Sequence, residues 1–226
     1  MSKEALIKLV KRMIRVVLGL LIFSFGNYLT IVANIGLAPW DCLAMGLSGK
    51  TGLSYGTWMT IVAVVILVVD LLLKESIGIG TVIDALVVGP FIDTYMKLIN
   101  LPYTRHWYIG VPVMFIGFMI MALGMYFYMG AGLSCGPRDA FLVAIGKRLR
   151  KLKIGVVEII IMVTVALVGF ALGGKIGIGT LEGMFLMGLA LQIVFGFLKF
   201  EPRNIEHENI LKSIKNLKAH TDTPSR

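Results

Sequence analysis

A chain of 226 residues in which 57% are hydrophobic and only 15% are charged cannot cover a water-soluble domain with polar groups. Its mean hydropathy of +0.86 predicts a protein whose main solvent is lipid. The net charge of +9 would suggest nucleic acid in a soluble protein, but the basic residues gather in the tails and one internal run, as in positive-inside membrane proteins, so we expect membrane lipid and no nucleic acid as a partner.

Six apolar runs are long enough, or nearly so, to cross a bilayer. After a basic cytoplasmic segment at 1–12, these runs approach the ~20 residues that a transmembrane helix needs. They cover 13–33, 56–73, 77–98, 107–130, 155–172 and 177–198. Because lipid offers the backbone no hydrogen-bond partners, we expect all of them to be α-helices. The predicted class is an all-α polytopic membrane protein.

Two shorter apolar elements, 37–49 and 135–149, stand apart from these runs. Each opens with a Pro-x-Asp string, which begins at Pro39 in the first element and at Pro137 in the second. A helix of ~14 residues reaches only ~21 Å, which is short of the ~30 Å hydrocarbon core. We therefore expect broken, re-entrant or short helices packed inside the bundle.

The chain also contains an internal repeat. The two Pro-x-Asp strings match at an offset of 98, and the run Ile-Gly-Ile-Gly-Thr at 77–81 recurs at 176–180, at an offset of 99. The repeat predicts two tandem homologous units, each with three long transmembrane helices and one short Pro-x-Asp helix. The units cover 13–98 and 107–198, with a linker at 99–106.

Two arrangements of the units are compatible with this pattern. If the short elements cross, the protein has eight spans in two parallel units, and Lys50, Lys97 and Arg105 share the cytoplasmic side with both termini. If they dip in and return, it has six spans in two inverted units, and these three cations lie outside. The loop charges favour the first arrangement, because it leaves fewer cations on the wrong side.

The segment 199–226 is polar. Its apolar residues are spaced for one helical face among lysines, at Ile205, Ile210, Leu211, Ile214 and Leu217. Two interpretations stay open, a basic amphipathic helix on the inner membrane surface and a partly disordered solubilising tail. Either one places the tail in the cytoplasm.

Ionisable residues inside the apolar runs are the candidates for function, because a charge at a helix centre costs at least ~2.5 kcal/mol. Asp41 and Asp139 lead, since they occupy equivalent positions in the two units. They are expected to line a substrate path, or else to cap the free N–H groups of their own helices. Their neighbours Trp40 and Arg138 belong to the same predicted site.

Other acids lie in the long runs. Asp84, Asp93, Glu158 and Glu182 are near helix ends, where a side chain can reach the interface. Asp93 falls on Gln192 in the second unit, and these two residues and Glu182 are the secondary site predictions. The excess of acids favours a cationic cargo, or coupling by protons or Na⁺.

Enzyme chemistry is not expected. His106, His207 and His220 lie in loops or the tail, so no catalytic triad or metal-ligand spacing can be assembled in the bundle. We predict no catalytic residues, no metal and no cofactor. The methionines and phenylalanines are expected to be packing or lipid-facing residues.

Four strings resemble the bacterial YczE/YyaS/YitT family of integral membrane proteins. They are Gly-Leu-Ala-Pro-Trp-Asp at 36–41, Thr-Gly-Leu-Ser-Tyr-Gly-Thr at 51–57, the Ile-Gly-Ile-Gly-Thr run and Gly-Pro-Phe-Ile-Asp at 89–93. The resemblance covers about 13–198 and implies a bacterial inner-membrane protein, but no substrate. The second unit departs from the first, with Arg138 in place of Trp40 and Gln192 in place of Asp93.

The functional prediction is a transporter or exporter of a small molecule or ion, working by alternating access between the units. An ion gradient would drive it, because the sequence has no nucleotide-binding segment. The alternatives are a non-transporting membrane scaffold or regulator and a substrate-binding subunit of a larger transporter. A homodimer is compatible with each of them.

Overall fold

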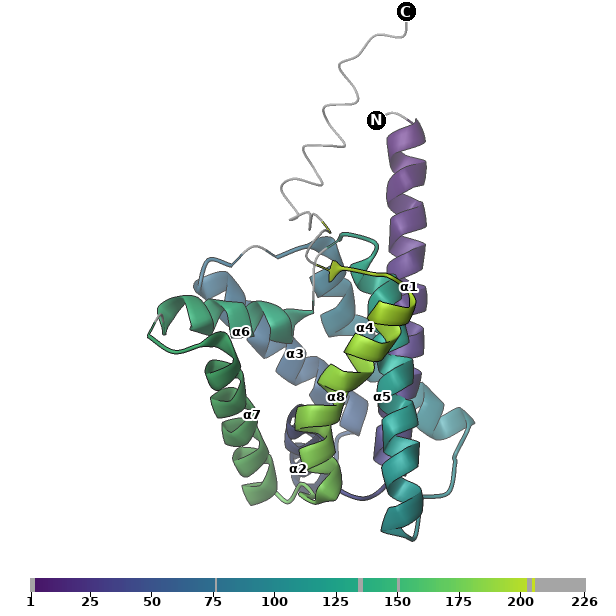
Figure 1. Ribbon diagram of the computed structural model, residues 1–226, viewed down its shortest axis with the longest axis vertical. Coiled ribbons are helices and arrows are strands. Elements are labelled where there is room, and N and C mark those ends of the chain that lie inside the picture. The colour runs from purple at the N-terminus through teal and green to yellow at the C-terminus, as the bar shows by residue number, and fades with distance from the viewer. Residues whose placement is uncertain (1–2, 76, 134–135, 150, 203–204, 206–226) are drawn as a thin grey trace, which may run out of the picture.

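The computed structural model describes residues 3–75, 77–133, 136–149, 151–202 and 205. Within these residues the chain forms eight α-helices and no strand. Figure 1 shows how the helices are arranged. The helices are α1 Lys3–Val32, α2 Pro39–Thr51, α3 Tyr55–Leu72, α4 Ile79–Leu98, α5 Trp107–Met129, α6 Pro137–Arg148, α7 Ile154–Ala171 and α8 Ile178–Phe197. The all-α prediction is confirmed. Of the polar segment 199–226, only 199–202 and 205 lie within the described ranges, so the two tail interpretations concern residues that lie mostly outside them.

The long helices have the length and surface of membrane spans. Five of the described helices, α3, α4, α5, α7 and α8, are long and apolar enough to cross a bilayer. Large apolar side chains point outward from them, including Leu72, Phe185 and Phe197, which are 75%, 69% and 88% exposed. Water-soluble surfaces rarely carry so much exposed apolar area, whereas lipid accommodates it. The chain is a polytopic membrane protein.

Helices α1 and α5 pack closely and run in opposite directions. Glycines bring the two backbones together at two crossing points. A Cβ added to Gly26 would lie 2.6 Å from the carbonyl oxygen of Gly117, and one added to Gly19 would lie 2.8 Å from that of Gly124. The earlier glycine of α1 thus meets the later glycine of α5, so the two helices are antiparallel.

This crossing yields a stability prediction. We expect Gly26→Leu to lower the thermal unfolding temperature in detergent, because overpacking costs ~1–3 kcal/mol even where side chains can adjust and here the neighbour is backbone. Gly196→Leu in α8 is the matched control, since no atom lies within 4 Å of a Cβ added there. Equal unfolding temperatures for the two variants would contradict the close α1–α5 packing.

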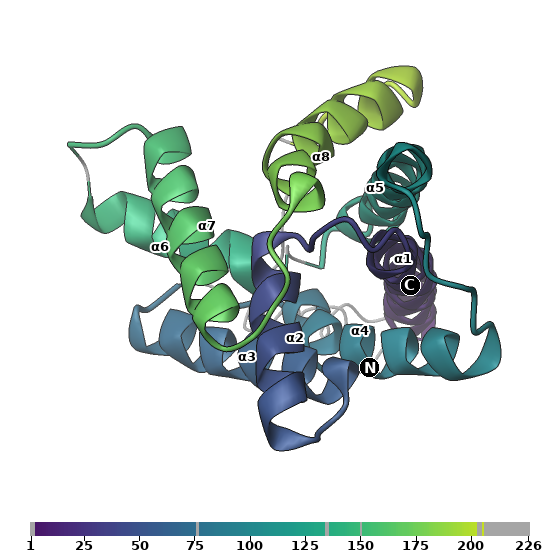
Figure 2. The ribbon, with the colours of Figure 1, turned by 90° about the horizontal axis from the view of Figure 1, so that it is seen from below.

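The antiparallel pair corrects the arrangement that the loop charges favour. In parallel units α1 and α5 would run the same way, and here they do not. In Figure 2 both are seen nearly along their axes. In this respect the structure matches the alternative with two inverted units. The loop charges did not predict this direction, because three loop cations are a weak bias beside the packing of two helices.

Equivalent loops connect the two sequence units. The backbone N–H of Gly80, at the start of α4, donates to the carbonyl of Leu133 at 2.8 Å, and that of Gly179, at the start of α8, donates to Ile35 at 2.9 Å. These two bonds join matching positions of the repeat. Moreover, α2 packs on α7, and α6 packs on α3. Each short helix thus lies against the opposite unit, with its N-terminal end near the middle of the bundle.

Candidate functional site

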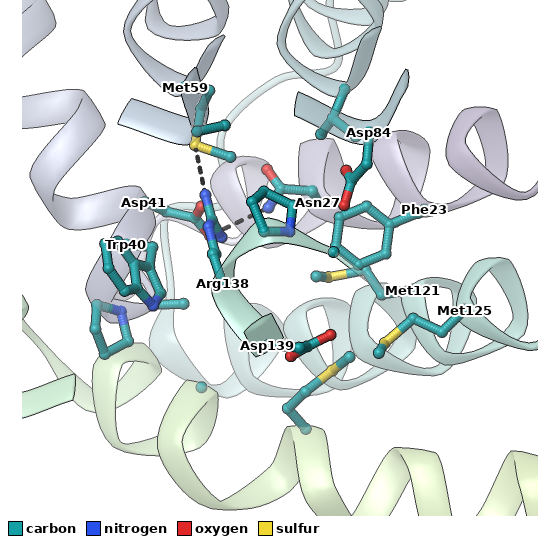
Figure 3. Close-up of a pocket in the computed structure, with 18 of the residues that line it drawn as sticks. Phe23, Asn27, Trp40, Asp41, Met59, Asp84, Met121, Met125, Arg138 and Asp139 are labelled. Carbon is teal, nitrogen blue, oxygen red and sulfur yellow. Dashed lines mark hydrogen bonds between the residues drawn. The ribbon is translucent and has the colours of Figure 1, made fainter. Parts of the chain in front are cut away.

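The N-terminal ends of α2 and α6 meet at a central cavity of ≈ 250 Å³ that residues of all eight helices line (Figure 3). Its lining includes the polar and charged residues Asn27, Asp41, Asp84, Arg138, Asp139 and Glu158, the aromatic residues Phe23, Trp40, Phe118 and Tyr128, and five methionines, Met59, Met121, Met125, Met162 and Met187. The structure therefore brings together four of the predicted site residues, Trp40, Asp41, Arg138 and Asp139. Proline at the first position of each short helix sets where these residues begin, because its fixed φ suits a helix start.

Asp41 joins three helices at the base of the cavity. The carboxylate is 3% exposed. The Tyr55 hydroxyl of α3 donates to its Oδ1 at 2.9 Å, and Nδ2 of Asn27 of α1 donates to its Oδ2 at 3.2 Å. Buried carboxylates need such partners, since an unpaired one is costly in an apolar interior. These contacts bridge helices and do not cap α2.

Asp139 is equivalent in sequence but differs in surroundings. Its side chain is exposed at the open side of the cavity. The backbone N–H of Gly136, the residue that precedes α6, lies near its carboxylate and interacts with it favourably. This position suits the capping interpretation, which the inter-helix contacts of Asp41 do not. The carboxylate of Asp139 faces the cavity (Figure 3).

Arg138 holds its charge inside the cavity through weak contacts. Its guanidinium lies over the ring of Trp40, 5.4 Å from the centroid, and Nη2 donates to Sδ of Met59 at 3.2 Å. Trp40 is itself 9% exposed. Among the described residues Arg138 forms no ion pair within 4 Å. Stacking on an aromatic face and a thioether is a weaker hold than a bidentate carboxylate would give.

Carboxyl groups outnumber bases in the cavity. Asp84 of α4 and Glu158 of α7 line it together with the two Pro-x-Asp aspartates, against the single guanidinium of Arg138. The guanidinium interacts electrostatically with Asp41, Asp84 and Asp139. Charges of one sign within a membrane bundle require compensation by cations or protons. The cavity therefore needs positive charge, supplied by cations or by protons, beyond the guanidinium of Arg138.

The three secondary candidates lie away from this cavity. Asp93 accepts hydrogen bonds from the hydroxyl of Ser54 and, at 2.8 Å, from the backbone N–H of Gly56, so it caps the start of α3. Gln192 is exposed on α8. Glu182 is 7% exposed, with neither carboxylate oxygen hydrogen-bonded to any described residue. The equivalence of Asp93 and Gln192 does not bring these residues together.

Several residues of functional interest in the structure are not predicted from the sequence. The five methionines and Phe23 of the cavity carry no signal that separates them from packing residues. Asp70 is fully buried in α3, and neither carboxylate oxygen has a partner within the described ranges. An acid inside an apolar run is a signal that could have found it.

The contacts of Asp41 yield a second stability prediction. We expect Tyr55→Phe to lower the free energy of unfolding by about 1–3 kcal/mol, because it removes the hydroxyl that donates to Oδ1 of Asp41 and lies within hydrogen-bond distance of Oδ1 of Asn27. Tyr103→Phe is the control, since Tyr103 is 58% exposed. Thermal unfolding in detergent measures both variants, and an unchanged Tyr55→Phe would contradict the network.

Comparison with known proteins identifies the family to which the chain belongs. Residues 10–195 match the family of unknown function DUF6198. The uncharacterized membrane protein YczE of Bacillus subtilis is 30% identical over 181 residues, which cover 77% of this chain and 80% of YczE. The uncharacterized protein YyaS of the same bacterium is 31% identical over 179 residues, 78% of this chain and 88% of YyaS.

An uncharacterized protein of Haemophilus influenzae is 27% identical over 180 residues, 80% of this chain and 81% of its own length. No solved structure matches the chain. The chain therefore belongs to the DUF6198 family, and its similarity to YczE and YyaS confirms the resemblance that its Pro-Trp-Asp and Gly-Pro-Phe-Ile-Asp strings predicted.

Proposed function

We propose that this protein is a small secondary transporter of the bacterial inner membrane, working by alternating access between two inverted units. The observation that carries the proposal is the central cavity, which both units line and into which the N-terminal ends of two short helices point. Broken or short helices that meet at a midplane cavity between inverted repeats are typical of secondary transporters. A scaffold has no need of a charged cavity at its centre.

The two units differ where a gate is expected. In the first unit Gly56 of α3 and Gly89 of α4 touch, since a Cβ added to either would lie 2.1 Å from the carbonyl oxygen of the other. The equivalent residues of the second unit are Gly155 of α7 and Gly188 of α8, and no atom lies within 4 Å of a Cβ added to either. Helices α3 and α4 are thus closed, whereas α7 and α8 diverge toward the end that carries the termini (Figure 1).

This difference between the two units indicates the two conformations of the transport cycle. In inverted repeats, the second conformation arises when each unit adopts the shape of the other. Helices α7 and α8 would then close through Gly155 and Gly188, while α3 and α4 separate. In the conformation seen here the open side is next to Asp139 and Glu158, the two exposed acids of the cavity lining.

Charge orients the molecule in the membrane. Basic residues gather at the end with the termini, at Lys8, Lys11, Arg12, Arg15, Lys147, Arg148, Lys151 and Lys153. The opposite end carries Lys50, Lys97, Arg105 and Lys175. By the positive-inside rule both termini are cytoplasmic, and the open side of the cavity faces the cytoplasm. The driving force is an ion gradient.

The test is a screen followed by transport. Compounds that raise the unfolding temperature of the purified protein are identified first, because a ligand of the folded state stabilises it. Hits are then measured for uptake into proteoliposomes with the full chain and with residues 206–226 deleted. We expect uptake by both forms, since the cavity lies wholly outside the tail. Hits that bind without crossing would contradict transport, and loss of partner recruitment in the deletion would favour a scaffold.

A further inference from the structure

We propose that the cargo is a small organic cation with an aromatic or apolar body, and that Arg138 occupies its position on Trp40 until it binds. This inference rests on the proposed transport function and gives it a substrate class. It follows from three features of the central cavity: its charge, the apolar part of its lining, and the weak hold on Arg138.

The charge selects a cation. The lining carries the carboxyl groups of Asp41, Asp84, Asp139 and Glu158 against one guanidinium. An incoming anion would add to this excess and would have only Arg138 to contact. An incoming cation neutralises carboxylates that no lysine or second arginine of the lining can pair with.

The apolar lining selects the body of the cargo. Five methionines and the rings of Phe23, Trp40 and Phe118 line the cavity together with smaller apolar residues. Thioethers are flexible and polarizable, so they adapt to aromatic and aliphatic shapes without directional bonds. At ≈ 250 Å³ the cavity lies below the ~300–1,000 Å³ of common ligand pockets, so the cargo is small.

Arg138 shows where a cation binds. Its guanidinium already lies over the Trp40 ring at 5.4 Å, which demonstrates that this face is accessible to a positive charge. Its other contact is the sulfur of Met59, a weak acceptor. Because Arg138 has no ion pair within 4 Å in the described part of the chain, a cargo cation can displace it from the Trp40 ring without breaking such a pair. Binding therefore exchanges one cation on Trp40 for another.

The probe is phenyltrimethylammonium, and equilibrium dialysis of the labelled compound against the purified full chain measures its Kd. We expect unlabelled phenyltrimethylammonium to compete. Its neutral isostere tert-butylbenzene and the anion benzoate should not. Competition by tert-butylbenzene equal to that of the cation would overturn the claim that charge selects the cargo.

Two substitutions with opposite effects test the exchange. Arg138→Gln removes the resident cation and should tighten phenyltrimethylammonium binding about tenfold, a gain that a misfolded variant cannot produce. Trp40→Leu should weaken it about tenfold. Arg105→Gln, in an exposed loop outside the cavity, is the control and should change nothing. Unchanged or weaker binding by Arg138→Gln would overturn the exchange.

The remaining outcomes separate this inference from the transport proposal. Benzoate that binds wild-type protein and is lost in Arg138→Gln would show an anion site, which refutes the cargo class and leaves alternating access standing. Phenyltrimethylammonium that binds as expected but is not carried into proteoliposomes would refute transport and leave a cation site.

Discussion

Gly188→Leu is expected to reduce transport at least about tenfold while leaving the fold and cargo binding intact. In the conformation seen here no atom lies within 4 Å of an added Cβ, so a leucine fits. When α7 and α8 close as α3 and α4 do, the same position meets backbone, as Gly89 meets Gly56. Overpacking such a contact costs ~1–3 kcal/mol or more, and ~1.4 kcal/mol is a factor of ten. The substitution thus blocks one conformation only.

The measurement is uptake into proteoliposomes beside the unfolding temperature and the Kd of the same variant. Gly196→Leu is the control, because it adds the same side chain to the same helix at another open glycine. We expect Gly196→Leu to transport normally. Wild-type uptake by Gly188→Leu would show that α7 and α8 never close in the cycle.

Asp41→Asn is expected to weaken cargo binding by about tenfold or more. The substitution keeps the shape of the side chain and removes the buried charge that faces the cavity. Loss of a charge-assisted contact in a buried site costs ~1.5–3 kcal/mol, which corresponds to at least a factor of ten. Asp139→Asn should act in the same direction, since Asp139 faces the same cavity.

Asp93→Asn is the matched control for these two variants. Asp93 caps α3 outside the cavity, so its substitution should lower the unfolding temperature without changing the Kd. The unfolding temperature and the Kd together separate a structural carboxylate from a ligand contact. If Asp41→Asn and Asp93→Asn affected the Kd equally, Asp41 would be a structural residue.

The sequence predicts both the long and the short helices, for physical reasons. Lipid requires helices of fixed length, and proline fixes a helix start, so α2 begins at Pro39 and α6 at Pro137, within two residues of the expected elements. Which helices pack against each other cannot be predicted in the same way. Gly26 packs on Gly117 and not on its own equivalent Gly124, a pairing across distant helices that no single sequence reveals.

The positions of the cavity acids likewise depend on contacts that a single sequence does not reveal. Asp84 lies near the start of α4, where the sequence suggests a side chain that reaches the interface. In the structure it lies beside Gly136, where an added Cβ would be only 2.6 Å from its Oδ2. At the equivalent contact the methyl group of Ala38 meets Gly183. Asp84 can thus enter the cavity because its distant neighbour is a glycine.

The distances between α3 and α4 and between α7 and α8 test alternating access most directly. Ile61 and Leu86 mark α3 and α4, Ile160 and Phe185 are their equivalents on α7 and α8, and all of them are exposed. Spin labels at each pair, in protein with Cys42 and Cys135 replaced by alanine, report the two separations in liposomes. We predict that the pair at 160 and 185 is the wider one in Gly188→Leu, and that in wild-type protein a bound cargo shifts the two pairs in opposite directions. Two fixed distances that neither ligand nor substitution changes would contradict the transport cycle.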